Sequence, residues 1–251
     1  QVYVQAKITI IKENSRMDDI IPNISRYANS QNRIQMADFS ANDPYHRKIE
    51  ELSRTIWAPA QGGGARQSKW FYERMSGQYN DSRNMAPAIK LFLAEYDPKQ
   101  KFDKTDLAKY ENCWDMLPHI VSKGKQDNFK YFAQRLAKSK VVPDQKYFEH
   151  LIAKAILFLH IHKETTNQFG KTYRANIVAY SFSYLAYKTA NKIDLDAIWK
   201  AQNIMSSLAT DIEKLIPFIN DHIRKSAGDR NVTQWCKQED CWKEDRKSTR
   251  L

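Results

Sequence analysis

The chain has 251 residues, enough for one large domain or two small ones, and its 42% hydrophobic and 12% aromatic content excludes a disordered protein. With 7 glycines and 8 prolines, the composition favours a mainly helical chain over a turn-rich β-sandwich. The net charge of +11 favours a polyanionic partner, because lysines and arginines that displace counterions from phosphates supply affinity for any sequence of nucleic acid.

The first predicted elements are a strand over 2–11, which is β-branched and aromatic, and a helix over 18–27 with isoleucines at helical spacing. A polar run follows at 25–32. Its guanidinium and amide groups can grip a phosphate or a base edge, and they can equally form a helix cap and loop. The candidate nucleic-acid contacts of this run are Arg26, Asn29, Gln31 and Asn32.

A second helix is predicted from Pro44, a residue favoured at the first helical position, with Asp43 as its cap. Apolar residues at helical spacing run from Tyr45 to Ile56. The opposite face, which includes His46 and Arg54, is expected to be solvated, and Arg54 is a further candidate contact to nucleic acid.

Three consecutive glycines at 62–64 precede a segment in which aromatic and cationic residues alternate. The glycine run lacks the order and context of a nucleotide-binding loop, so we expect a flexible connector. Aromatic rings interleaved with cations are what sites for single-stranded nucleic acid use. Phe71 is expected in the core, while the candidate contacts are Lys69, Tyr72, Arg74 and Gln78.

The stretch 97–146 is rich in lysine and gives the clearest electrostatic footprint of the chain. A helix is predicted after Thr105 and Asp106, and another near the cationic segment 122–126. We expect the phosphate contacts here to be Lys104, Lys109, Lys123 and Lys125, against the alternative of a plain solvated surface.

The later part of the chain predicts a helical array, with helices over 147–160, 173–189 and 195–216, the last capped by Asp194 and interrupted at Pro217. A short helix is expected from Asn231, followed by a frayed charged tail over 243–250. The expected fold is therefore α+β, predominantly α-helical, with a short N-terminal β segment. Its two regions are a basic α+β region at 1–146 and a helical region at 147–251.

No catalytic set emerges from residue spacing, so the catalytic residues stay unknown. The pair His160 and His162 lacks further ligands at zinc spacing, and Cys236 and Cys241 lack a second pair, so we predict no metal site. Three cysteines form no even disulfide set, and no leader or membrane-length apolar stretch is evident, which together indicate a cytoplasmic protein without a membrane partner.

Several ungapped segments of the chain belong together: YANSQN at 27–32, EELSR at 50–54 with IWAP at 56–59, KWFYER at 69–74 with GQY at 77–79, KTDLAKYEN at 104–112, LPHIVSKG at 117–124 and NVTQW at 231–235. Taken together, these segments resemble the abortive-infection phage-resistance family, AIPR. The resemblance covers nearly the whole chain and implies a bacterial cytoplasmic protein of phage defence. It carries over no catalytic residue.

The sequence therefore predicts part of an anti-phage defence protein that binds DNA or RNA through a basic polar face. One alternative is part of a metal-dependent nuclease whose carboxylates lie in upstream sequence. That alternative would require a divalent metal, while no cofactor is expected in this chain. Another alternative is a protein-interaction or toxin-control module, with a defence-system protein or a second copy of the chain as partner.

Overall fold

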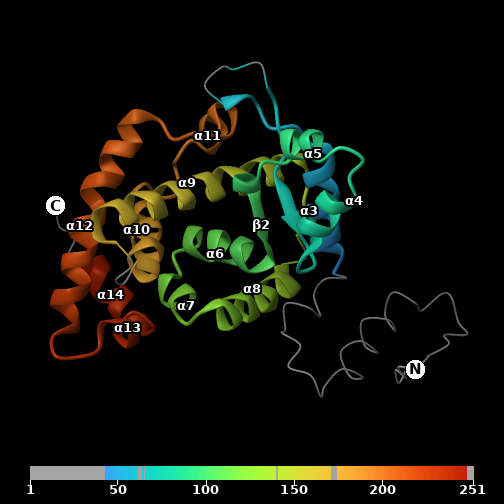
Figure 1. The fold of residues 1–251 in the computed structure, drawn as a ribbon. Coiled ribbons are helices and arrows are strands. Elements are labelled where there is room, and N and C mark those ends of the chain that lie inside the picture. The colour runs from blue at the N-terminus through green and yellow to red at the C-terminus, as the bar shows by residue number, and fades with distance from the viewer. Residues whose placement is uncertain (1–42, 62–63, 65, 140, 171–173, 248–251) are drawn as a thin grey trace, which may run out of the picture.

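The computed structural model describes residues 43–61, 64, 66–139, 141–170 and 174–247 (Figure 1). The expected strand at 2–11, the helix at 18–27 and the four candidate contacts Arg26, Asn29, Gln31 and Asn32 lie outside the described residues. The described part is α+β and predominantly helical, as predicted.

Helix α3, Pro44–Thr55, begins where the sequence predicts it. The Asp43 carboxylate accepts a hydrogen bond from the backbone N–H of Tyr45 at 2.9 Å, and Pro44 occupies the first turn, where no N–H is needed. The expectation of a fully solvated opposite face is wrong for His46, which is buried against Tyr72 and Phe129.

The sheet consists of two short parallel strands, β1 (Phe71–Glu73) and β2 (Lys101–Asp103), paired in register from Phe71 with Lys101 to Glu73 with Asp103. The segment between them contains helices α4 (Gln78–Met85) and α5 (Ile89–Glu95) and the 3-10 turn η4 (Pro98–Gln100). Parallel strands require such a crossover connection.

Both faces of β1 are covered, because alternate side chains point to opposite sides of a strand. Tyr72 belongs to the main core, while Phe71 packs edge-on against Tyr79 and Tyr96 in a small separate cluster beneath α4 and α5. A strand buried on both faces leaves none of its large side chains for a ligand.

Helices α6 (Lys104–Trp114), α7 (Pro118–Ser122) and α8 (Lys125–Ser139) follow β2 directly. The predicted helix near Thr105 is confirmed, but its cap is Asp103. The Asp103 carboxylate accepts the backbone N–H groups of Thr105 and Asp106, and the Asp106 carboxylate accepts the N–H of Asp103 in return.

The remaining helices form the predicted array. They are α9 (Gln145–Phe169), α10 (Arg174–Lys188), α11 (Leu195–Ala201), α12 (Ser206–Ala227), α13 (Val232–Trp235) and α14 (Glu239–Lys247). Asp194 and Asn231 cap α11 and α13 as expected. Of the tail predicted to fray over 243–250, residues 243–247 belong to helix α14, and residues 248–250 lie outside the described residues.

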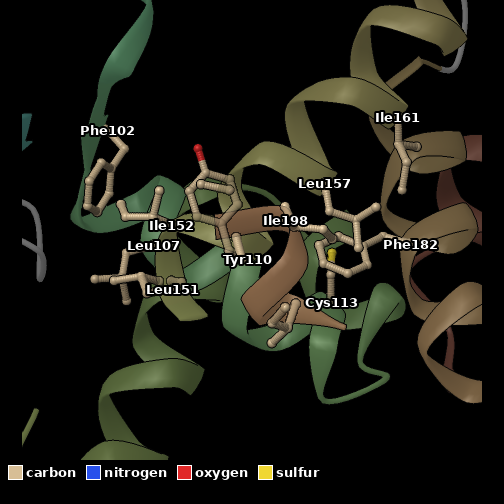
Figure 2. Packing of buried hydrophobic residues seen from close by; sticks show 14 of the residues in the cluster. Phe102, Leu107, Tyr110, Cys113, Leu151, Ile152, Leu157, Ile161, Phe182 and Ile198 are labelled. Atoms are coloured by element: carbon tan, nitrogen blue, oxygen red, sulfur yellow. The ribbon is translucent and has the colours of Figure 1, made fainter. Parts of the chain in front are cut away.

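Helix α9 crosses the molecule and contacts α3, α6, α10, α11 and α12 (Figure 1). Its buried residues Leu151, Ile152 and Leu157 meet side chains of α6, α10 and α11, as Figure 2 shows. The main cluster extends from Tyr45 to Ile216, so it contains residues from both sides of position 146/147.

Two details of the later helices correct the prediction for 195–216. The helix expected over 195–216 is interrupted at Gln202, which adopts a left-handed φ of 48°. The Gln202 side-chain oxygen accepts a hydrogen bond from the indole N–H of Trp70 at 2.9 Å. Pro217 lies inside α12 without ending it. Proline leaves the carbonyl four residues earlier without its helical donor. Here the Gln168 side-chain amide of α9 donates to that Glu213 carbonyl at 3.1 Å, which replaces the missing bond.

Candidate nucleic-acid interface

Three candidate residues converge on one carboxylate, that of Glu50 on α3. The Arg74 guanidinium donates to Glu50 Oε2 at 2.6 Å, the Gln78 amide donates to Oε1, and an Arg54 nitrogen lies 3.9 Å from Oε1. The structure thus brings Arg54, Arg74 and Gln78 together. It does so around an internal negative charge, which lowers the attraction of this cluster for a polyanion.

Arg54 is further committed to the protein interior. Its guanidinium lies 3.6 Å from the centroid of the Phe71 ring and donates to the Tyr72 carbonyl at 3.1 Å. Burial lowers the pKa of Arg54, against the opposing effects of Tyr96 and Glu50. Arginine remains charged in proteins, so the ring and Glu50 stabilise a largely desolvated cation.

Lys69 has a similar local partner. Its ammonium donates to Glu95 of α5 at 2.8 Å and lies 4.4 Å from the centroid of the Trp57 ring. The Lys69 side chain is only 11% exposed. Lys109 likewise pairs with Asp106, at 2.7 Å within α6.

Two candidates are buried and cannot reach a large ligand. Tyr72 is fully buried, and its hydroxyl lies 2.6 Å from Nδ1 of His46. Its ring is therefore unavailable to stack on a base, contrary to the expectation, because β1 is covered on both faces. Lys104, expected to hold a phosphate, is 5% exposed at the first position of α6. The alternation of cations and aromatic residues along β1 does not show whether both faces of the strand are covered. The burial of Tyr72 could therefore not be predicted from it.

Lys123 and Lys125 are different, because both are exposed at the turn that leads into α8. Further along the helix Lys130, Gln134 and Lys138 are exposed at intervals of four residues, with the exposed Tyr131 ring beside them. Neither Tyr131 nor Gln134 was singled out from the sequence, although the four-residue spacing in 130–138 could have revealed the stripe. We name this set the α8 surface: Lys123, Lys125, Lys130, Tyr131, Gln134 and Lys138.

The four lysines of the α8 surface form no ion pair with any carboxylate that the structure describes. Helix α8 itself is fixed to α6 by buried amides. The Asn112 side chain donates to the Asn128 side chain at 2.7 Å, and Arg135 donates to Asn112 at 2.7 Å while also pairing with Asp115. The exposed lysines therefore project from a helix whose position is well determined.

The chain matches the family model described as AIPR protein over residues 1–227. It belongs to the AIPR family. The match supports a bacterial protein of abortive infection and phage resistance, as the sequence resemblance implied. No curated protein and no solved structure shows significant similarity to this AIPR chain.

A cleft of about 340 Å³ between α9 and α11 of the AIPR chain was not foreseen from the sequence. On its wall His150 lies 3.0 Å from the Asp196 carboxylate, which also pairs with Lys146. Deeper, Lys154 donates to Glu111 at 2.8 Å, and Glu111 accepts the Tyr147 hydroxyl at 3.2 Å. His150, Lys154 and Asp196 of the lining are paired with opposite charges, and Asp194 caps α11, so we assign the cleft no ligand.

In the described part of this AIPR protein, no group of three or more His, Cys, Asp or Glu side chains could hold a metal ion. The Asp144 carboxylate caps α9 by accepting the backbone N–H of Tyr147. Of the helices that the structure describes, none is both long enough and apolar enough to cross a bilayer.

Proposed function

We propose that this AIPR protein serves phage defence by binding nucleic acid, and that the α8 surface is the main contact. The observation that carries the proposal is the pairing state of the candidate cations. Arg54, Lys69, Arg74 and Lys109 face internal carboxylates, whereas Lys123 and Lys125 are exposed without such a partner among the described residues.

The shape of the α8 surface suits a flexible strand. Lys130 and Lys138 lie on one stripe about 12 Å apart along the helix axis, at 1.5 Å per residue. Gln134 between them offers an amide to a base edge or sugar, and Tyr131 is 36% exposed, enough to stack on a base. The exposed Asp127 is a single opposing charge in the first turn.

The test is a titration of labelled single-stranded DNA and RNA at several salt concentrations. Lys130→Glu/Lys138→Glu should weaken binding by at least about tenfold and reduce the salt dependence, because each phosphate contact in a single strand contributes about 0.7 to the slope. The control Lys200→Glu/Lys214→Glu makes the same charge change on exposed residues of α11 and α12. Equal losses in both variants would mean that net charge, rather than this surface, holds the nucleic acid.

We also propose a cytoplasmic location, because the three cysteines, Cys113, Cys236 and Cys241, form no even disulfide set. Among the described residues, no set of metal ligands supports the nuclease alternative.

A further inference from the structure

The ring of Tyr131 is the aromatic group of the α8 surface. It is 36% exposed, and neither another aromatic ring nor a hydrogen bond to its hydroxyl engages it among the described residues. Tyr187 of α10 is similarly exposed at 39%, but its ring packs edge-on against Trp242. Tyr131 therefore offers both its ring and its hydroxyl to a ligand, whereas the ring of Tyr187 already has a contact within the protein.

A guanidinium covers one face of the Tyr131 ring. The Cζ atom of Arg135, one turn further along α8, lies over the ring at 6.0 Å from its centroid. Arg135 is itself fixed to α6, because it donates to Asn112 at 2.7 Å and pairs with Asp115. The ring is thus backed by a cation whose own position is determined. Stacking on the other face of the ring then requires less ordering, which lowers the entropy cost of binding.

The neighbours of Tyr131 on the helix surface are amide and cationic side chains. At 3.6 residues per turn, Gln134 lies about 60° and Lys138 about 20° around the helix from Tyr131, at rises of about 4.5 and 10 Å. Lys130 lies on the adjoining flank, about 100° away. Asp127, one turn earlier, is an exposed carboxylate on the same side as the ring. A strand that runs from Tyr131 toward Lys138 therefore meets cations and moves away from this carboxylate.

A duplex would use this set of side chains less well than a single strand. The bases of a duplex are stacked on one another, so an aromatic ring stacks on a base only where that base is unpaired. A helix that reads a major groove makes its commonest specific contact through arginine or lysine, and arginine bonds guanine in bidentate fashion. The single arginine of α8, Arg135, is held by Asp115 instead.

We propose that the α8 surface selects single-stranded nucleic acid over duplex by stacking an unpaired base on the Tyr131 ring. This inference rests on the function proposed above, because Lys130 and Lys138 hold phosphates of the same strand. Every base has a π face, so the selection is for an unpaired strand rather than for a sequence. Unpaired bases on a phosphodiester strand are common to DNA and RNA, and separate measurements with each distinguish the two sources.

Three labelled ligands test the selection, each made as DNA and as RNA. They are a single strand of about 12 nucleotides, the same strand paired as a duplex, and the same strand with abasic sites at its centre. The abasic strand keeps the phosphates, so its affinity reports what the bases add. The whole chain should bind the intact single strand at least about fivefold more tightly than the other two ligands. Equal binding of the duplex or of the abasic strand would overturn the proposal.

Substitutions of Tyr131 locate the contact. Tyr131→Leu should weaken binding of the intact single strand about fivefold or more, and should leave binding of the abasic strand and the duplex within about twofold. Tyr131→Phe keeps the ring and should stay within about twofold of the wild type for all three ligands. The slope of log affinity against log salt should not change in Tyr131→Leu, because no phosphate contact is lost.

The matched control is Tyr187→Leu, which makes the same change at a similarly exposed tyrosine of α10 and should alter none of these affinities. An equal loss for all three ligands in Tyr131→Leu would show that the ring is needed for the structure of α8 and would contradict the proposal. An equal loss in Tyr187→Leu would likewise contradict it, because the effect would then not belong to the α8 surface.

Failure of this inference is distinguishable from failure of the proposed function. Lys130→Glu/Lys138→Glu could weaken binding and reduce its salt dependence while Tyr131→Leu leaves the preference for the intact strand unchanged. The α8 surface would then hold phosphates without stacking a base, and only this inference would be wrong. If the lysine variant instead binds as well as the control Lys200→Glu/Lys214→Glu, the proposed function fails and this inference fails with it.

Discussion

The hydroxyl of Tyr72 lies 2.6 Å from Nδ1 of His46, and both side chains are buried, one on β1 and the other on α3. Their rings are stacked, with centroids 6.1 Å apart, and Phe129 of α8 covers the other side of the imidazole. The contacts among Tyr72, His46 and Phe129 thus join β1, α3 and α8, which are distant from one another in sequence. They also explain why Tyr72, which alternates with cations in the chain, is a structural residue.

Protonation of His46 should make stability depend on pH. Burial lowers the pKa of His46 to about 3, with Lys104 and Arg74 acting in the same direction. The unfolded chain binds this proton near pH 6.5, so stability is lost as pH falls below that value, by about 2 kcal/mol between pH 7 and pH 5. Urea unfolding across this range should show the loss in the wild type and a flatter dependence in His46→Gln. A slope unchanged by the substitution would assign the effect to other groups.

Removing Arg74 should cost stability and leave nucleic-acid binding intact. Arg74→Gln breaks the 2.6 Å charged bond to Glu50, whose side chain is only 19% exposed, and should lower the free energy of unfolding by about 1–3 kcal/mol. Binding of a labelled oligonucleotide should stay within about twofold of the wild type, because this cation is used internally. An unchanged melting temperature together with lost binding would instead show that the cluster around Glu50 contacts nucleic acid.

The buried pair of Lys154 and Glu111 should behave unlike surface pairs. Lys154→Met leaves Glu111 buried without its cation and should destabilise the chain by about 3 kcal/mol or more, whereas Lys154→Met/Glu111→Leu should recover part of that loss. In the exposed pair Lys48–Glu51, Lys48→Met should cost less than about 1 kcal/mol. Denaturant unfolding of the double-mutant cycle measures the coupling, and a coupling near zero would contradict it.

The interior proline of α12 gives a further prediction. Gln168→Ala removes the amide that donates to the Glu213 carbonyl and should destabilise the wild type by about 0.5–1.5 kcal/mol. In a Pro217→Ala background the helix regains its own N–H donor, so the same substitution should cost less. Thermal unfolding of the four proteins would decide; equal costs in both backgrounds would show that the Gln168 bond does not compensate for the proline.

Local patterns in the sequence determined much of this protein. Asp43 with Pro44, Asp194 and Asn231 begin their helices where their chemistry predicts, since caps depend on neighbouring residues alone. The positive charge and the family resemblance are also properties of the sequence. The end of a helix is harder to predict from local sequence. Helix α12 continues past Pro217 because Gln168, a residue of another helix, supplies the missing hydrogen bond.

Only the tertiary structure decided which cations face solvent. Arg74 meets a carboxylate 24 positions away and Lys69 one 26 positions away, and no periodicity within a segment encodes such partners. Lys123 and Lys125 look no different from them in the sequence, yet α6 and α8 pack so that both stay exposed. A lysine's charge belongs to its residue type, but its availability depends on which distant carboxylate the fold brings within reach.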